Sequence, residues 1–294
     1  MGGGFAGTAL TWLLARDGFF SSRAYAAEKE PTRSPLAPKK PHFAAKAKSC
    51  IFLMMNGGPS QVDTFDYKPE LRKHAGKTLP ADKKFINSGG RKMGFLTPNW
   101  RPFKPGGKSG LLVSDYFPRI REHADKFAVI KSCHTDSHAH GSALVAMNTG
   151  STFIGRPSLG SWMVYGMGTE NQNLPGYVVM HARSKFPEQS LFGRLWGTGF
   201  LSSNHQGILL RSQGDPVLYL SNPKGISQQI RRGLLDDLGA LNRIKQAEVG
   251  DPEILTRIAQ YEMAYKMQTS VPGLVDVQTE PQHVLDLYGP DVTR

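Results

Sequence analysis

Two stretches of the chain pair a short apolar run with a cluster of polar residues. Residues 50–55 form an unbroken apolar run of strand length, which ends at an Asn-Gly-Gly-Pro turn. Residues 127–130 form a second run, and residues 134–142 follow it with three His, one Asp and two Ser. Such runs, bounded by turn residues, are typical of buried parallel strands that carry polar groups at their carboxyl ends. We therefore expect both clusters at one edge of an α/β sheet, in a single site.

Apolar residues recur at helical spacing in the C-terminal quarter of the chain and predict an amphipathic helix over residues 226–247. The residues of this pattern are Ile226, Ile230, Leu234, Leu238, Leu241 and Ile244. Asp251 followed by Pro252 is typical of a helix start, so a second helix is expected from there to about Met267. Neither helix carries reactive side chains, and we expect both to pack in the core.

Shorter elements are expected between these regions. Pro118 favours a short helix over residues 119–125. Residues 142–147 suit a helix that Asn148-Thr149-Gly150 closes. Further strands are predicted at residues 177–180 and 208–210.

The amino end has the pattern of an export signal followed by a linker. Residues 5–14 are apolar and residues 24–26 (Ala-Tyr-Ala) have the form of a cleavage site, so residues 1–26 are expected to be a signal-like segment. The run is too short to span a bilayer, so no transmembrane anchor is expected. The alternative is a frayed amphipathic helix, because no basic residue precedes the run. The Pro- and Lys-rich residues 27–47 are expected to be a mobile, dispensable linker to a domain of residues 48–294.

The composition is that of a folded protein with a basic surface. Of the 294 residues, 39% are hydrophobic and 20% charged, which supports a normal core and excludes global disorder. The net charge of +12 comes from scattered Lys and Arg, without a dense run or a nucleic-acid motif, so no nucleic-acid partner is expected. Cys50 and Cys133 form either a disulfide or two buried thiols. The absence of a Cys-x-x-Cys pattern argues against a structural zinc site.

The two polar clusters contain candidate metal ligands. His138 and His140 alternate along the chain, so both would face one side of an extended segment and could bind one ion. Asn56 and Asp63 follow the other apolar run with oxygen donors. Imidazole and carboxylate together suit zinc, manganese or iron. The alternative is that the His residues hydrogen-bond loop carbonyls, and that Asp63 and Asp66 cap the following turn.

Other residues of the same segments are candidates for nucleophile or substrate binding. Ser137 and Ser142 could act as nucleophiles, because a hydroxyl at a helix N-terminus is favoured by the helix dipole and the nearby amides. Ser142 could equally be an N-cap. Gly57 and Gly58 would let the backbone approach a ligand closely. Arg156 would either pair with a phosphate or sulfate or form a surface salt bridge.

Several blocks of sequence occur in an order typical of one family. They are residues 56–66 (Asn-Gly-Gly-Pro-Ser-Gln-Val-Asp-Thr-Phe-Asp), 68–71 (Lys-Pro-Glu-Leu), 134–150, 155–162 (Gly-Arg-Pro-Ser-Leu-Gly-Ser-Trp) and 174–178 (Leu-Pro-Gly-Tyr-Val). Through these blocks the chain resembles the family catalogued as domain of unknown function 1501 (DUF1501), over roughly residues 48–294. An exported start, often of twin-arginine type, fits this resemblance. No Arg pair is present in the N-terminal segment, so either the start of the signal lies upstream or the signal is a poor one.

That family is similar to the alkaline phosphatase and sulfatase superfamily. The resemblance implies an α/β fold with a mainly parallel sheet flanked by helices, and a divalent metal ion (zinc, manganese or calcium) at the carboxyl edge of the sheet. Counting back from Gly150, the nucleophile position of sulfatases falls on His140, the motif's Pro on Ser142 and its Arg on Leu144. Asn56 stands where the first strand usually ends in a metal-binding Asp. Both departures argue against phosphatase or sulfatase chemistry that uses the superfamily's usual nucleophile.

The resemblance implies an exported, metal-dependent hydrolase of a small phosphate or sulfate ester, in which the metal polarises the ester oxygen and activates water. The candidate roles are catalysis for His140 and Ser142, metal binding for Asn56, Asp63 and His138, and substrate binding for Gly57, Gly58 and Arg156. The alternative is a non-catalytic exported relative that binds a ligand or polysaccharide through the same cleft. Because similar chains continue beyond residue 294, we expect a C-terminal truncation, with weak or absent metal binding and no turnover from residues 1–294 alone.

Overall fold

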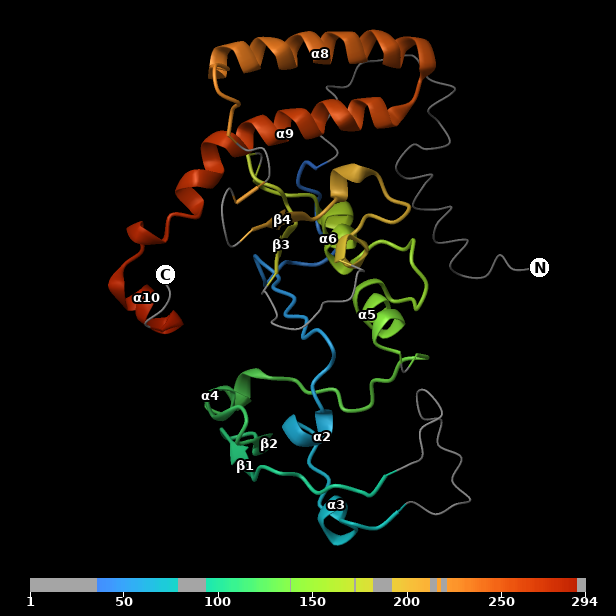
Figure 1. The fold of residues 1–294 in the computed structure, drawn as a ribbon, viewed down its shortest axis with the longest axis vertical. Coiled ribbons are helices and arrows are strands. Elements are labelled where there is room, and N and C mark those ends of the chain that lie inside the picture. The colour runs from blue at the N-terminus through green and yellow to red at the C-terminus, as the bar shows by residue number, and fades with distance from the viewer. Residues whose placement is uncertain are drawn as a thin grey trace, which may run out of the picture.

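A computed structural model describes residues 36–78, 94–137, 139–171, 173–181, 192–211, 216–217 and 221–289. Figure 1 shows these elements arranged along one long axis. Two long antiparallel helices, α8 and α9, lie at one end, and the hairpin β1–β2 with α2, α3 and α4 lies at the other. Helices α5 and α6 and the strand pair β3–β4 lie between them.

Helices α8 (Gln228–Val249) and α9 (Pro252–Leu274) confirm the two helices predicted in the C-terminal quarter. The hydroxyl of Ser227 accepts a hydrogen bond from the Ile230 amide at the start of α8, and Gly250 ends the helix in the left-handed conformation. Asp251 caps α9 by accepting from the Glu253 amide at 2.9 Å. The second helix runs past its expected end near Met267, through a further turn that contains Pro272.

Strands β3 (Val178–Met180) and β4 (Ile208–Leu210) confirm the two strand predictions in the middle of the chain. They pair in parallel, with Val179 opposite Leu209. Helix α6 (Leu159–Met167) and the short 3₁₀ helix η2 (Ser203–His205) contact each other, and Gly160 of α6 lies against the ring of Tyr177, the residue before β3. Met267 and Val271 of α9 are buried against Ile208 of β4, and this contact forms the core of the upper part.

The hairpin of β1 (Phe103–Gly106) and β2 (Leu111–Ser114) lies in a stretch that carries no strand prediction. The strands are antiparallel, with Phe103 opposite Ser114. The helix predicted over residues 119–125 is present in two pieces, α4 (Pro118–Arg121) and the 3₁₀ helix η1 (Ala124–Lys126). Both pieces pack against β2, whose Val113 is fully buried.

The remaining helices are short. They are α2 (Gln61–Thr64), α3 (Glu70–Lys73), α5 (His140–Thr149), α7 (Phe192–Leu195), the 3₁₀ helix η3 (Val277–Thr279) and α10 (Gln282–Tyr288). Helix α5 confirms the helix predicted over residues 142–147, and Gly150 ends it with a φ of 75°. In the described ranges, no helix is long and apolar enough to cross a membrane.

The strand predicted at residues 50–55 is absent, and this prediction is wrong. The run lies outside both described sheets, with Ile51 and Leu53 exposed. Residues 127–130 likewise have no ladder partner. An apolar run becomes a strand only where another segment supplies its hydrogen bonds, and such partners are distant in sequence. Cys50 and Cys133, expected as buried thiols or a disulfide, are exposed free thiols.

Both sheets of the described residues have two strands, one pair antiparallel and one parallel. The larger, mainly parallel sheet flanked by helices therefore stays a prediction. The parallel pair β3–β4 is the part of the described structure that has the expected strand direction.

Part of the predicted mobile linker is held in place. The Lys39 amide donates to the carbonyl of Met167, and the Thr169 amide donates to the carbonyl of Leu36, each at 2.8 Å. The Lys39 ammonium donates to the Tyr165 carbonyl at 2.7 Å. Residues 36–39 therefore pack against the C-terminal end of α6, which corrects the expectation that the whole of residues 27–47 is mobile.

Candidate functional site

The second polar cluster lies at the N-terminal end of α5, where two serine hydroxyl groups meet. The Oγ atoms of Ser137 and Ser142 are 2.5 Å apart. Ser142 Oγ also donates to the Ala139 carbonyl at 3.3 Å, and Ser137 Oγ accepts from the Ala139 amide at 3.2 Å. These bonds join Ser137, Ala139 and Ser142 at the start of the helix.

Helix α5 begins at His140, and its N-cap Ala139 contributes no capping side chain. The amide groups of the first turn of any helix have no intrahelical partner, and the helix dipole places partial positive charge there. His140 is exposed at this position, and Ser142 is half-buried. The N-terminus of α5 thus combines amide donors that have no intrahelical partner, two linked hydroxyl groups and an exposed imidazole, which suits the binding of an anion.

Asn56, Gly57 and Gly58 form an exposed turn in the other predicted cluster. Both glycines have positive φ, 83° and 71°, and the Gly58 amide donates to the Met55 carbonyl at 3.2 Å. A Cβ at either glycine would meet nothing within 4 Å. Their need for glycine therefore comes from the turn conformation, not from a close approach of the chain to another group.

Asp63 lies half-buried in α2, directly after this turn. The other carboxylate of the segment, Asp66, forms an ion pair with Lys68 at 2.9 Å instead of capping the next helix. Asn99 donates from its side-chain amide to the Val62 carbonyl, which ties α2 to the segment that precedes β1.

The predicted metal ligands do not assemble into a centre in the described part of the chain. No group of three or more His, Cys, Asp or Glu side chains that could hold a metal ion occurs among those residues. His138, one of the predicted ligands, lies outside the described residues. Asp63 belongs to α2, which contacts β2, whereas His140 and Ser142 belong to α5, which contacts α7. Asn56 lies in the exposed turn before α2. Their convergence in a single site remains a prediction.

Arg156, the predicted anion-binding residue, is exposed, and the backbone beside it is firmly held. The Ser158 amide donates to the Gly197 carbonyl at 3.0 Å, and the Ser161 hydroxyl donates to the same carbonyl at 3.1 Å. Gly199, with a φ of 57°, packs so closely on the peptide that joins Arg156 to Pro157 that a Cβ would overlap it. The loop thus presents the guanidinium to solvent from a fixed backbone.

The half-buried Tyr177 joins two of the sequence blocks. Its ring packs against the Cα positions of Gly160 and Gly207, where an added Cβ would overlap the ring. Its hydroxyl hydrogen-bonds Ser158, whose own hydroxyl lies 3.0 Å from that of Ser161. Burial raises the pKa of Tyr177, and the hydrogen bond to Ser158 lowers it by less. Several residues of these blocks therefore have a packing role.

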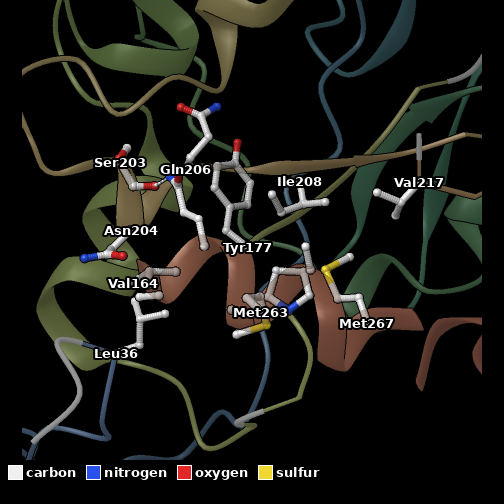
Figure 2. Close-up of a pocket in the computed structure, with 15 residues that line it drawn as sticks. Leu36, Val164, Tyr177, Ser203, Asn204, Gln206, Ile208, Val217, Met263 and Met267 are labelled. Atoms are coloured by element: carbon white, nitrogen blue, oxygen red, sulfur yellow. Dashed lines mark hydrogen bonds between the residues drawn. The ribbon is translucent and has the colours of Figure 1, made fainter. Parts of the chain in front are cut away.

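An apolar pocket of about 370 Å³ opens beside Tyr177. Figure 2 shows Ser203 and Asn204 on one side of the ring and Ile208 and Val217 on the other. Met263 and Met267, one turn apart on α9, close it from below. The surface that lines the pocket is predominantly apolar, and Ser203, Asn204, Gln206 and Gln260 contribute polar side chains to it. The sequence analysis did not predict this pocket. The one sequence feature that points to it is the pair Met263 and Met267, which are four residues apart and therefore lie on one face of α9.

The sequence profile of a family described as "Protein of unknown function (DUF1501)" matches residues 47–294. The chain belongs to this family. The match contains the turn at Asn56, the whole of α5 and the pocket residues from Val164 onward. No curated protein and no solved structure matches the chain.

Proposed function

We propose that this DUF1501 member is an exported relative of phosphate- or sulfate-ester hydrolases, and that it binds the anionic group of a small ester at the N-terminus of α5. The observation that carries the proposal is the hydrogen-bonded pair of Ser137 and Ser142 beside His140, at a helix start that has no capping side chain. Helix N-termini with free amides and hydroxyl groups are suited to phosphate and sulfate.

The described residues do not provide the three or more converging donors that a divalent metal centre needs. No step is therefore assigned to a metal. In the proposed role, the amides of the first turn and the two serine hydroxyl groups bind the ester oxygens. His140, exposed beside them, exchanges a proton with the leaving group or with an attacking water, the usual role of an imidazole near neutral pH.

The test is a titration with inorganic phosphate and with sulfate, followed by two-dimensional NMR. We expect chemical-shift changes at the amides of residues 140–143 and at the His140 ring. Ser142→Ala should weaken binding by about tenfold, the equivalent of roughly 1.4 kcal/mol for a lost hydrogen bond to an anion. The matched control is His283→Gln, because His283 also lies in the first turn of a helix but outside the cluster.

The same variants extend the test from binding to turnover. Hydrolysis of an aryl phosphate or sulfate, with or without added zinc or manganese, should fall in His140→Gln and stay unchanged in His283→Gln. Shift changes that are equal in wild type, Ser142→Ala and His283→Gln, or changes confined to other regions, would contradict the proposed site.

The pocket beside Tyr177 favours a second candidate function, that of a non-catalytic relative that binds a ligand. None of its lining residues belongs to α5, it is lined mainly by apolar surface, and its volume lies in the range of small-molecule sites. Binding of 1-anilinonaphthalene-8-sulfonate that is reduced by Ala259→Phe, which fills the rim, but not by Ala247→Phe on the surface of α8, would support this function. Purification without stoichiometric transition metal would agree with it as well.

Export is part of the proposal and has its own test. If residues 1–26 act as a signal, the mature protein recovered from the periplasm or medium should begin at residue 27. Recovery of the protein with Met1 from the cytoplasm alone would contradict export.

A further inference from the structure

Helix α8 has an apolar stripe that nothing in the described structure covers. Its members and their exposed fractions are Ile230 (50%), Leu234 (57%), Leu238 (37%), Leu241 (64%) and Ile244 (60%). Figure 1 shows α8 as the outermost element at its end of the molecule, with α9 on its inner side. We call these five residues the α8 stripe. Exposed apolar rows of this kind mark interaction surfaces.

The opposite face of α8 contacts α9 and is mostly polar. Arg232 pairs with Glu262 across the two helices, and Gly239 is buried at the point where they approach. The side chain of Asn242 is half-buried on the same face. The expectation that this helix packs its apolar residues into the core is therefore wrong, because its polar face makes the contact.

We propose that the α8 stripe is the contact surface between two copies of this chain, with the two α8 helices antiparallel about a twofold axis at Leu241. The spacing of the stripe, 4, 4, 3 and 3 residues, keeps its members on one side of the helix, as in helices that pair along their length. With the axis at Leu241, residues 233–249 of the two α8 helices lie side by side, which is about 25 Å of contact, and Ile230 lies beyond the end of the partner helix.

The charges beside the stripe are complementary in this arrangement. Counting outwards from Leu241, Lys245 of one copy faces Asp237 of the other, and the twofold axis repeats this pair. Leu238 then lies opposite Ile244 and Leu234 lies opposite Glu248, so the contact is apolar at its centre only. Asp237 and Lys245 are exposed in the single chain, on the same side of α8 as the stripe, and are therefore available for a partner.

Two other arrangements fit the same charges less well. In a parallel pair, Asp237 would face Asp237 and Lys245 would face Lys245, which is repulsive. A membrane surface attracts helices whose polar face is rich in Lys and Arg. Helix α8 carries four basic residues against three acidic ones, and Asp237 lies on the apolar side, where lipid would have to take up its charge. A second copy is therefore the favoured occupant.

The test measures the association of the full chain by sedimentation velocity over a dilution series. We expect a concentration-dependent monomer–dimer equilibrium, with a dissociation constant raised at least about tenfold by Leu241→Glu. Leu241 is exposed, so this change leaves the fold of the single chain intact. The matched control is Ala247→Glu, which places the same charge on the exposed surface of α8 but off the stripe, and should leave association unchanged.

Charge-swap variants test the antiparallel register. Asp237→Lys alone and Lys245→Asp alone should each weaken self-association, because like charges then face each other. A mixture of the two single variants should form a heterodimer, and the double variant should associate like wild type. A chain that is monomeric at all concentrations, association insensitive to Leu241→Glu, equal effects in all charge variants, or binding of the stripe to anionic vesicles in place of a second copy would each overturn the proposal.

Discussion

Arg232 of α8 makes a bidentate contact with Glu262 of α9, through hydrogen bonds of 2.9 and 2.6 Å. Arg232 also pairs with Asp236 within its own helix, at 2.7 Å, and lies over the Tyr265 ring at 4.9 Å from its centre. This cluster fixes how α8 and α9 lie against each other. It compensates for the polar character of the contact between the two helices.

The contact between Arg232 and Glu262 should contribute measurably to stability. Because both side chains are partly solvated, we expect Glu262→Gln to lower the free energy of unfolding by only about 1 kcal/mol, the upper end for an exposed pair with bidentate geometry. Chemical denaturation at pH 7 measures the loss. Glu248→Gln, on the exposed surface of α8, is the matched control and should have no effect.

The same pair predicts the direction of the pH dependence. The hydrogen bonds from Arg232 hold the pKa of Glu262 below its ordinary value of 4.5. The stabilisation is therefore fully present above pH 4.5 and is lost as the pH falls through the lowered pKa of the folded state. Glu262→Gln should therefore make the free energy of unfolding less dependent on pH below pH 4.5. An unchanged pH dependence would contradict this role of Glu262.

Two glycines of α6 should respond oppositely to alanine. At Gly160 an added Cβ would overlap the ring of Tyr177, whereas at Gly166 it would meet nothing within 4 Å. Gly160→Ala should therefore destabilise the protein by about 1–3 kcal/mol, the cost of overpacking. Gly166→Ala should stabilise it by roughly 0.5–1 kcal/mol, because alanine has the higher helix propensity.

Thermal denaturation of the two variants is the measurement, and equal shifts in midpoint would mean that Tyr177 does not pack on α6. Tyr177→Phe gives a second readout. Because burial raises the pKa of Tyr177, its contribution to stability is present below its ordinary pKa of 10 and is lost as the pH rises through the higher value. The spectrophotometric titration of Tyr177→Phe should lack the component that ionises at the higher pH.

Local signals predicted the helices well. The apolar spacing and the capping Asp251 placed α8 and α9, because caps and helical periodicity depend on residues close in sequence. They did not predict which face of α8 would be buried. The apolar stripe that contains Ile230 and Leu234 has the pattern of a core face. Which face of α8 is buried depends on α9, however, and Glu262 of α9 pairs with Arg232 on the other face of α8.

Strands were predicted less reliably, since a strand needs a distant partner. The strands that contain Val178 and Ile208 pair with each other, whereas the equally apolar residues 50–55 have no pairing strand among the described residues. At the candidate site, the cluster around Ser142 was visible because its members are neighbours along the chain. The pocket beside Tyr177 was not, because Val164, Ile208 and Met263 meet only after folding.

Asp125 should control the turn between β1 and β2. Its carboxylate accepts from the amides of Lys108 and Ser109, at 2.9 and 2.7 Å, and these hydrogen bonds lower its pKa. Asp125→Ala should speed amide hydrogen exchange at Leu111–Ser114, because the turn loses its acceptor. Glu122→Ala, a nearby exposed acidic residue, should leave exchange unchanged.

The pH dependence of the same exchange follows from the lowered pKa. The stabilisation of the turn by the Asp125 carboxylate is fully present above the ordinary pKa of 3.8. It is lost as the pH falls through the lowered pKa of the folded state. After correction for the intrinsic exchange rate, protection of the hairpin should fall at acid pH in the wild type. Protection that has the same pH dependence in Asp125→Ala would contradict this role.

The segment of residues 36–39 should stabilise α6, although it precedes the family match at residue 47. Two backbone hydrogen bonds join it to Met167 and Thr169. The Lys39 ammonium donates a hydrogen bond to the Tyr165 carbonyl and lies 4.9 Å from the centre of the Tyr165 ring. Gly168 has a φ of 70° and packs on the backbone of Ala37 so closely that a Cβ would overlap it.

A chain that begins at residue 48 should therefore unfold at a lower temperature than one that begins at residue 36. Two backbone hydrogen bonds at about 1 kcal/mol each correspond to a fall in midpoint of roughly 4–8 °C for a protein of this size. Lys39→Ala should reproduce part of this loss, whereas Lys40→Ala, its exposed neighbour, should not. Equal midpoints for the two chain lengths would show that residues 36–47 are a dispensable linker, as their composition alone suggests, and that their contacts with α6 add nothing to stability.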